Sequence, residues 1–219
     1  MYKSEFPEKA YETFVNHELL SNGYMIYLPS QRKEESLGYD ALLHGLRGSG
    51  IKAVALQYKV VSQYKRTPQY FHSPCFRFVL HKSANVYKQH NIMVRRNTMT
   101  PRRVLALYCV PNFVDYQSLY NYLRNGTLLR HSSLLMPFSR INDSNHHYIA
   151  FDDTKAEQFS KEPQTVAAYD LQYLFELQEP MHYRDLVSEN DCDQHTFMQE
   201  LDSFLRSTHS FLVYKCMDE

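Results

Sequence analysis

Two apolar segments joined by a short connection constrain the fold of this chain most. The segments LGYDALL (residues 37–43) and IKAVALQYKV (residues 51–60) have strand-like composition, and HGLRGSG between them is rich in turn-forming residues. We therefore predict a β-hairpin. Antiparallel pairing about this connection would bring Asp40 of the first strand near the end of the second strand that carries Gln57 and Lys59.

Alternation along the second strand separates its side chains into two sets. One face is apolar and is assigned to the core: Val54, Leu56 and Tyr58. The other face begins with alanines and ends with Gln57 and Lys59, which project together. A carboxylate, an amide and a lysine in one cluster suit phosphodiester hydrolysis. Mg²⁺ prefers oxygen ligands, and a lysine can orient the attacking water or stabilise a developing oxyanion.

The rest of the chain alternates helical and strand patterns. This alternation favours an α/β or α+β protein with a mixed sheet flanked by helices, and 219 residues suit a single domain. We expect helices over residues 7–23, 83–96 (capped by Ser83), 115–126 (capped by Asp115), 165–178 and 193–207. Further strands are expected over residues 24–30, 75–81, 102–110, 133–141, 146–152 and 211–215, and residues 31–36 form a helical turn or loop.

Several classes of protein are disfavoured by composition. The chain has only 6 glycines and no glycine-rich nucleotide-binding motif. Its N-terminus lacks the apolar region of a secretory signal, and no apolar run approaches the length of a membrane span. Its 4 cysteines are far apart and form no CxxC pair, which favours reduced thiols over a zinc site. We therefore expect a cytoplasmic protein that does not contact a membrane.

The net charge of zero conceals a strong asymmetry along the chain. Residues 41–114 contain 12 Lys and Arg and no Asp or Glu, whereas residues 143–219 contain 16 acidic and 5 basic residues. This segregation predicts a polyanion partner for the middle of the chain, unless the two parts pair with each other. The residues expected to contact nucleic acid are Lys65, Arg66, Lys88, Arg95 and Arg96. Aromatic residues interleaved with these cations could stack on unpaired bases or belong to the core: Tyr64, Tyr70, Phe71, Phe76 and Tyr87.

The hairpin motifs resemble those of a known enzyme superfamily. GYD (residues 38–40) followed by ALQYK (residues 55–59) resembles the core motif of the PD-(D/E)xK nucleases, in the Mrr-like variant with QxK. The longer stretch LPSQRKEESLGYDALL is also similar to small restriction-endonuclease-like proteins of bacterial defence loci. The resemblance covers residues 8–110 and implies a restriction-endonuclease-like mixed sheet. Residues 111–219 would form a C-terminal α/β extension with an acidic helical end.

The resemblance also implies a role for each residue of the motif. Asp40 would bind Mg²⁺ or Mn²⁺, Gln57 would take the second acidic position, and Lys59 would be the catalytic lysine. Glu34 is our choice for the glutamate that completes the catalytic and metal-binding set. Three other glutamates remain open for that place: Glu35 beside it, and Glu12 or Glu18 on the first helix.

The chain departs from the superfamily pattern at two positions. Tyr39 stands where the motif has proline, and Gln57 is neutral, so it is a weaker metal ligand than a carboxylate. We nevertheless expect a Mg²⁺-dependent endonuclease that hydrolyses DNA, in an antiviral-defence or mobile-element setting that the resemblance implies. The alternative is a non-catalytic subunit of nuclease fold that binds DNA or a partner protein. We also leave open a third function, the hydrolysis of RNA or small molecules on another fold. Binding to another defence-system protein and self-association stay open as well.

Overall fold

The computed structural model describes residues 1–44, 53–64, 71, 74–80, 87–99, 104–137, 139–143, 145–159, 164–166 and 168–170. All of these residues belong to the unit Met1–Pro180. Its helices are α1 (Glu8–Ser21), α2 (Gln31–Leu37), α3 (Lys88–Met99) and α4 (Tyr116–Asn125), with the 3₁₀ turn η1 (Leu129–His131). They accompany two sheets, so the prediction of a mixed α/β protein is confirmed. Within the described residues, no helix has the length and apolar character needed to cross a membrane.

The first sheet is mixed and contains the predicted hairpin. Its strand order is β12-β8-β7-β4-β3-β2. The strands are β2 (Ile26–Tyr27), β3 (Ala41–His44), β4 (Ala53–Tyr58), β7 (Val104–Pro111), β8 (Ser132–Leu135) and β12 (Ala168–Asp170). β3 and β4 are antiparallel, whereas β4 and β7 are parallel and are joined by a long connection that includes α3. We call this the mixed sheet.

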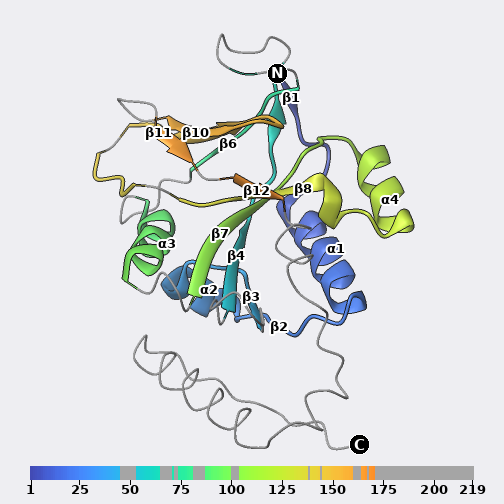
Figure 1. The fold of residues 1–219 in the computed structure, drawn as a ribbon, viewed down its shortest axis with the longest axis horizontal. Helices are drawn as coiled ribbons and strands as arrows, with labels where there is room; N and C mark the ends of the chain where they lie inside the picture. Colours follow the sequence, from blue (N-terminus) through green and yellow to red (C-terminus); the bar gives the residue numbers. More distant parts are fainter. Residues whose placement is uncertain are drawn as a thin grey trace, which may run out of the picture. The chain divides into compact units, whose positions relative to one another are not determined.

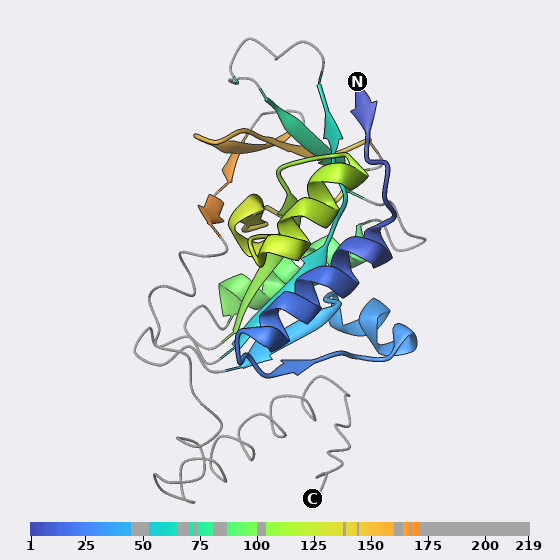
Figure 2. The same ribbon diagram turned by 90° about the vertical axis from the view of Figure 1, so that its right-hand side faces the viewer.

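The second sheet is antiparallel throughout and has the order β1-β5-β6-β9-β10-β11. Its strands are β1 (Tyr2–Lys3), β5 (Ser62–Gln63), β6 (Phe76–Val79), β9 (Tyr148–Phe151), β10 (Ala156–Phe159) and β11 (Gln164–Val166). The chain passes from β4 into β5 through residues 59–61, as Figures 1 and 2 show. Lys59 therefore lies where the chain leaves the mixed sheet for this antiparallel sheet.

The core forms where α1 covers one face of the mixed sheet. Tyr11, Val15 and Leu19 of α1 are fully buried in one cluster with the apolar side chains of β4. That face of β4 is the one assigned to the core from sequence alternation: Val54, Leu56 and Tyr58. In Figure 1, α3 lies on the other side of the β4–β7 pair from α1. The Gln57 face of the hairpin is therefore turned away from α1.

Several predicted elements are confirmed, and one helix is wrong. The helix after Asp115 begins with the expected cap, because Ser118 N–H donates to Asp115 Oδ1 at 2.7 Å, and it ends at Gly126 with a φ of +63°. The predicted helix over 165–178 is contradicted, because β11 pairs with β10 and β12 pairs with β8 there. The β-branched Thr165 and Val166 suit such a strand. Residues 171–178, Ser83, the helix over 193–207 and the strand over 211–215 lie outside the described residues.

Candidate active site

The register of the hairpin places Asp40 opposite Gln57. Ala41 pairs with Leu56 and His44 with Ala53, and the backbone N–H of Asp40 donates to the Leu56 carbonyl at 2.8 Å. Asp40 Oδ2 then accepts two hydrogen bonds of 2.8 Å, from Gln57 Nε2 and from the backbone N–H of Tyr58. The two residues that the motif pairs are therefore in direct contact at the end of β4.

A glycine directs the chain into this position. α2 ends at Gly38, whose φ is +73° and whose N–H donates to the Glu34 carbonyl at 2.8 Å. A Cβ at this position would lie 3.0 Å from Cγ2 of Ile92 on α3 and 3.2 Å from the Gln89 carbonyl oxygen. Glycine is thus required both by the left-handed backbone and by the close approach of α3. The turn delivers Asp40 to the start of β3 two residues later.

Asp40 has an unusual electrostatic environment for an aspartate. It is only 8% exposed, and burial raises the pKa of its carboxyl from 3.8 to about 7, although Lys59 and the Tyr58 N–H favour the ionised form. Its Oδ1 atom accepts no hydrogen bond from the described residues. The carboxyl therefore titrates near neutral pH and keeps one oxygen available to a ligand.

Gln57 presents an oxygen that lacks a hydrogen-bond partner. The side chain is 3% exposed, and because its Nε2 donates to Asp40, the amide oxygen points away from the carboxylate. Within the described part of the chain, this buried Oε1 accepts no hydrogen bond. A buried polar atom left unpaired costs roughly 1–3 kcal/mol. A cation bound at this oxygen would remove that cost.

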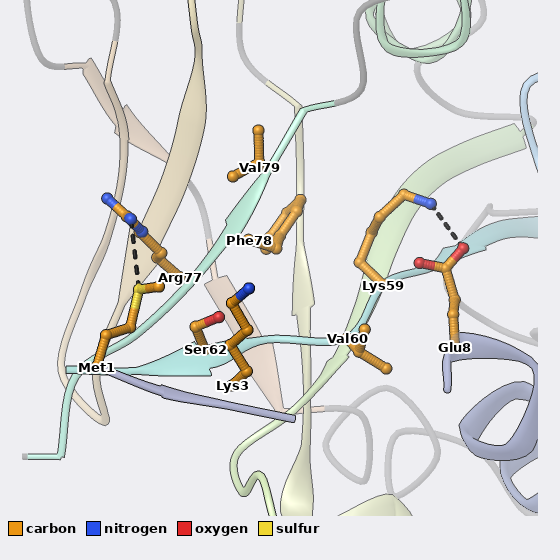
Figure 3. Close-up of a pocket in the computed structure, with 9 residues that line it drawn as sticks. All are labelled: Met1, Lys3, Glu8, Lys59, Val60, Ser62, Arg77, Phe78 and Val79. Atoms are coloured by element: carbon orange, nitrogen blue, oxygen red, sulfur yellow. Dashed lines mark hydrogen bonds and ion pairs between the residues drawn. The ribbon is translucent and has the colours of Figure 1, made fainter. Parts of the chain in front are cut away.

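Lys59 is held by a residue that the sequence analysis did not select. Its backbone N–H donates to the Cys109 carbonyl at 3.1 Å, and its Nζ donates to Glu8 Oε1 at 2.9 Å, as Figure 3 shows. The lysine side chain is 9% exposed and the glutamate 36% exposed. Glu8 lies in the first turn of α1, directly after Pro7. A proline followed by a glutamate is a sequence signal for a helix start with a carboxylate in its first turn, so Glu8 could have been found from the sequence.

The four candidate glutamates have different positions. Glu12 is 8% exposed and accepts from Lys9 Nζ at 2.6 Å, and its charge contributes to raising the pKa of Asp40. Glu18 accepts from two buried backbone N–H groups, of Leu128 at 2.9 Å and Leu129 at 3.2 Å, so it anchors η1. Glu18 therefore has a structural role at the opposite end of α1.

Glu34, the preferred candidate, is affected by charges near Asp40 but does not contact Asp40 or Gln57 through a hydrogen bond. Burial raises the pKa of its carboxyl, Lys9 lowers it and Glu12 raises it. No hydrogen bond links Glu34 to Asp40 or Gln57 among the described residues. The side chain of Glu35 lies outside the described part. The structure thus brings together Asp40 and Gln57, with Lys59, Glu8, Glu12 and Glu34 as charged neighbours.

The donor set at this site suits Mg²⁺ better than zinc. Among the described residues, no group of three His, Cys, Asp or Glu side chains is arranged to hold a metal ion. Asp40 Oδ1 and the unpartnered Gln57 Oε1 provide two oxygens. Mg²⁺ usually keeps several waters and takes only one or two protein carboxylates together with substrate phosphate. Both atoms are oxygen donors of the type that Mg²⁺ takes, but the Gln57 amide oxygen points away from the Asp40 carboxylate.

The residues predicted to contact nucleic acid are spread over different environments. Lys88 and Arg95 are exposed on α3, whereas Lys65 and Arg66 lie outside the described residues. Arg96 is only 8% exposed. Its Nε donates to the Leu37 carbonyl at 3.2 Å, and its guanidinium lies 5.4 Å from the ring centroid of Tyr39. Arg96 thus packs α3 against the end of α2, which lies shortly before Asp40 in the sequence.

The predicted stacking aromatics are mostly core residues. Tyr87, Phe76 and Phe71 are 1%, 5% and 7% exposed, and only Tyr64 is half-buried. Tyr70 lies outside the described residues. Of this set, Tyr64 is therefore the described ring that a base could reach.

A cleft of about 250 Å³ opens beside Lys59. It lies between the end of β4 and the antiparallel sheet, and its charged lining residues are Lys3, Glu8, Lys59 and Arg77. Figure 3 shows Lys59 and Glu8 together on one side of the cleft and Arg77 on the other. Three cations and one carboxylate give the cleft a positive balance that favours an anionic ligand.

No protein-family model, curated protein or solved structure matches this chain. A function for it therefore depends on its own residues and their geometry.

Proposed function

We propose that this chain is a metal-dependent nuclease of PD-(D/E)xK type, with Asp40 and Gln57 as metal ligands and Lys59 as the catalytic lysine. The observation that carries the proposal is the 2.8 Å hydrogen bond from Gln57 to Asp40, which leaves the buried Gln57 Oε1 without a partner among the described residues. Asp40 Oδ1 and Gln57 Oε1 thus accept no hydrogen bond from the described residues, at the end of β4 where the charge of Lys59 acts on Asp40.

The order of the elements supports a restriction-endonuclease-like arrangement. The resemblance leads us to expect a helix, then the aspartate on a core strand, then QxK on the next strand, then a helix and a strand. The chain has α1, β3 preceded by Asp40, β4 followed by Lys59, α3 and β7 in that order, with β2 and α2 inserted before β3 and with β5 and β6 inserted between β4 and α3. β4 and β7 are parallel neighbours, as a helical crossover between them allows.

The residues can be given roles in phosphodiester hydrolysis. In this reaction a water oxygen gives up a proton and bonds to phosphorus while the bond to the leaving oxygen breaks, and the leaving oxygen takes up a proton. When bound, Mg²⁺ would lower the pKa of a water and neutralise charge on the phosphate. Asp40 and Gln57 would hold the ion, and the Lys59 ammonium would orient the water or stabilise charge that develops on the phosphate oxygens.

The carboxyl of Asp40 links this function to pH. A metal ligand must be deprotonated, and the pKa of Asp40 is about 7. Metal binding would therefore release a proton from Asp40 near neutral pH, and metal affinity would increase as pH rises through 7. Glu8 and Glu12 contribute to this elevated pKa, so loss of either negative charge would lower it.

Cleavage assays with the full chain test the proposal. Wild-type protein with Mg²⁺ or Mn²⁺ is expected to cut DNA, and Asp40→Asn is expected to lose at least about 100-fold in rate, because it removes a charged metal ligand. Asp153→Asn is the matched control, since Asp153 is an exposed turn residue. Equal rates for Asp40→Asn and Asp153→Asn would contradict the proposal.

A non-catalytic subunit of the same fold is the second candidate. It is favoured by the Lys59–Glu8 ion pair and by the lack of a three-ligand metal group in the described part of the chain. DNA binding that is indifferent to Mn²⁺ and to Asp40→Asn, without cleavage, would support this candidate. A defence or mobile-element setting remains a proposal that depends on the resemblance alone.

A further inference from the structure

The cleft beside Lys59 is lined by a row of donor groups from three neighbouring strands. Lys3 of β1 pairs with Ser62 of β5, and Ser62 pairs with Arg77 of β6, so the three side chains leave the sheet on the same face. All three line the cleft, together with Lys59 and Glu8. Figure 3 shows Lys3 and Ser62 between Arg77 and the Lys59–Glu8 pair. An ammonium, a hydroxyl and a guanidinium are thus neighbours at one cleft.

The charges of this row are not neutralised by carboxylates. Among the described residues, Lys3 and Arg77 form no ion pair, and the side chains of Lys3 and Ser62 form no hydrogen bond. Arg77 is held by rings instead, because its guanidinium carbon lies 4.8 Å from the ring centroid of Tyr64 and 5.1 Å from that of Tyr148. These contacts fix the guanidinium and leave its positive charge uncompensated.

Lys59 and Glu8 lie on the other side of the cleft, and the two partners of this ion pair differ in exposure. The side chain of Lys59 is 9% exposed, whereas that of Glu8 is 36% exposed. Water solvates an exposed carboxylate well, so Glu8 can release the ammonium at little cost. An anion in the cleft can therefore replace Glu8 as the partner of Lys59.

The size and the other walls of the cleft limit what it can hold. Its volume of about 250 Å³ lies below the roughly 300–1,000 Å³ of clefts that enclose drug-sized molecules, so its ligand is small. The remaining lining residues are apolar: Met1, Val60, Phe78 and Val79. Apolar walls reduce the water around a bound ion, which strengthens its attraction to the cations.

We propose that this cleft binds a phosphate group, which Lys3, Ser62 and Arg77 hold beside Lys59. A phosphate group is negatively charged and offers several acceptor oxygens, so ammonium, hydroxyl and guanidinium donors can bind it together. Glu8 opposes this ligand, because its carboxylate repels the phosphate and occupies Lys59. The inference deepens the proposed function and rests on it for its role, in which the cleft holds a substrate phosphate next to the one that is attacked.

Calorimetric titration of the full chain with sodium pyrophosphate, in buffer that contains EDTA, tests this inference in the absence of cleavage. Wild-type protein is expected to bind. Lys3→Ala should weaken binding about 2- to 5-fold, because Lys3 is exposed. Lys59→Ala removes a buried charge and should weaken binding about 10- to 150-fold. Glu8→Gln should instead strengthen binding about 2- to 5-fold, because it removes the competing carboxylate.

Control variants outside the cleft match the charge changes. Arg130→Ala removes one positive charge at an exposed position of η1, and Asp153→Asn removes one negative charge from an exposed turn. Both should bind pyrophosphate within about 2-fold of wild type. Ser62→Ala changes no charge and should weaken binding about 2- to 10-fold through loss of one hydrogen bond. Thermal unfolding verifies that each variant is folded.

Three results would each overturn the inference. They are the absence of pyrophosphate binding, affinities of folded Lys3→Ala and Lys59→Ala that match Arg130→Ala, and an affinity of Glu8→Gln no higher than that of Asp153→Asn. Pyrophosphate binding in the expected order by a protein that never cuts DNA would support the phosphate site while the nuclease proposal fails. Metal-dependent cleavage by a protein that does not bind pyrophosphate would do the reverse.

Two further titrations identify the source of the phosphate group. A thymidine dinucleotide carries a single internal phosphodiester, whereas thymidine 5′-monophosphate carries a terminal phosphate. Tighter binding of the dinucleotide would assign the cleft to the interior of a nucleic-acid chain. Tighter binding of the monophosphate would assign it to a free nucleotide or a chain end, and both results support a phosphate site.

Discussion

Gln57 and Asp40 face each other across β4 and β3, and the Gln57 amide donates a 2.8 Å hydrogen bond to the Asp40 carboxylate. This contact determines what the pair can bind. It fixes the amide nitrogen on the carboxylate and leaves the amide oxygen buried and without a partner among the described residues. A neutral glutamine at position 57 also avoids placing two like charges side by side in a buried site. The consequences can be tested by changing each residue.

Gln57→Glu would place a second carboxylate against Asp40. Without metal, repulsion between the two carboxyl groups should lower the melting temperature at pH 8. Mn²⁺ should then stabilise this variant more than wild type, because a ligand that binds only the folded state raises its stability by an amount that grows with the logarithm of its affinity. Thermal unfolding with and without Mn²⁺ measures both effects, with Gln63→Glu on β5 as control. An identical Mn²⁺ response in Gln57→Glu and wild type would exclude a metal at this position.

Asp40→Asn should change how stability depends on pH. Because the pKa of Asp40 is about 7 in the folded protein and near 3.8 when unfolded, the folded state holds this proton more tightly. The free energy of unfolding of the wild type therefore falls as pH rises from about 4 to 7, and the full penalty persists above 7. The variant should be more stable than wild type at pH 8, by at most about 4 kcal/mol.

Urea unfolding in metal-free buffer from pH 4 to pH 8 measures the effect of Asp40→Asn. The advantage of the variant should shrink as pH falls towards 4, where the carboxyl is protonated in both states. A difference between the two proteins that does not change with pH would show that burial does not raise the pKa of Asp40.

Glu18→Ala should destabilise the protein without affecting the site. The change removes the acceptor of two buried backbone N–H groups, of Leu128 and Leu129, so we expect a loss of roughly 2 kcal/mol or more. Urea unfolding measures this loss, and calorimetry with Mn²⁺ measures metal affinity, which should match that of wild type. Glu12→Ala is the comparison, because its charge acts on Asp40. If Glu18→Ala reduced metal affinity and Glu12→Ala did not, Glu18 would be the glutamate of α1 that completes the proposed metal site.

The hairpin could be predicted because local rules determine it. Alternation assigned Val54, Leu56 and Tyr58 to the core, and the turn-rich connection set the direction of pairing. Asp40 and Gln57 are only 17 residues apart, so the register of one hairpin was enough to bring them together. The boundaries of α4 followed from its cap and its terminal glycine in the same way.

The rest of the site depends on contacts that no local pattern contains. Glu8 and Lys59 are 51 residues apart and meet only because α1 packs across the end of β4. The antiparallel sheet consists of strands of two to four residues, which are too short for a clear alternation signal. Arg96 could be recognised as basic but not as buried, because its packing depends on how α3 meets α2.

The rate of DNA cleavage by Lys59→Ala under single-turnover conditions with Mg²⁺ tests the nuclease proposal most directly. Lys88→Ala, at an exposed lysine of α3, is the control for loss of one positive charge. Lys59→Ala is expected to cut about 100- to 1,000-fold more slowly than wild type, as for removal of one group that stabilises a transition state, while remaining folded and able to bind Mn²⁺. Cleavage by folded Lys59→Ala at the rate of Lys88→Ala would contradict the assignment of Lys59 as the catalytic lysine.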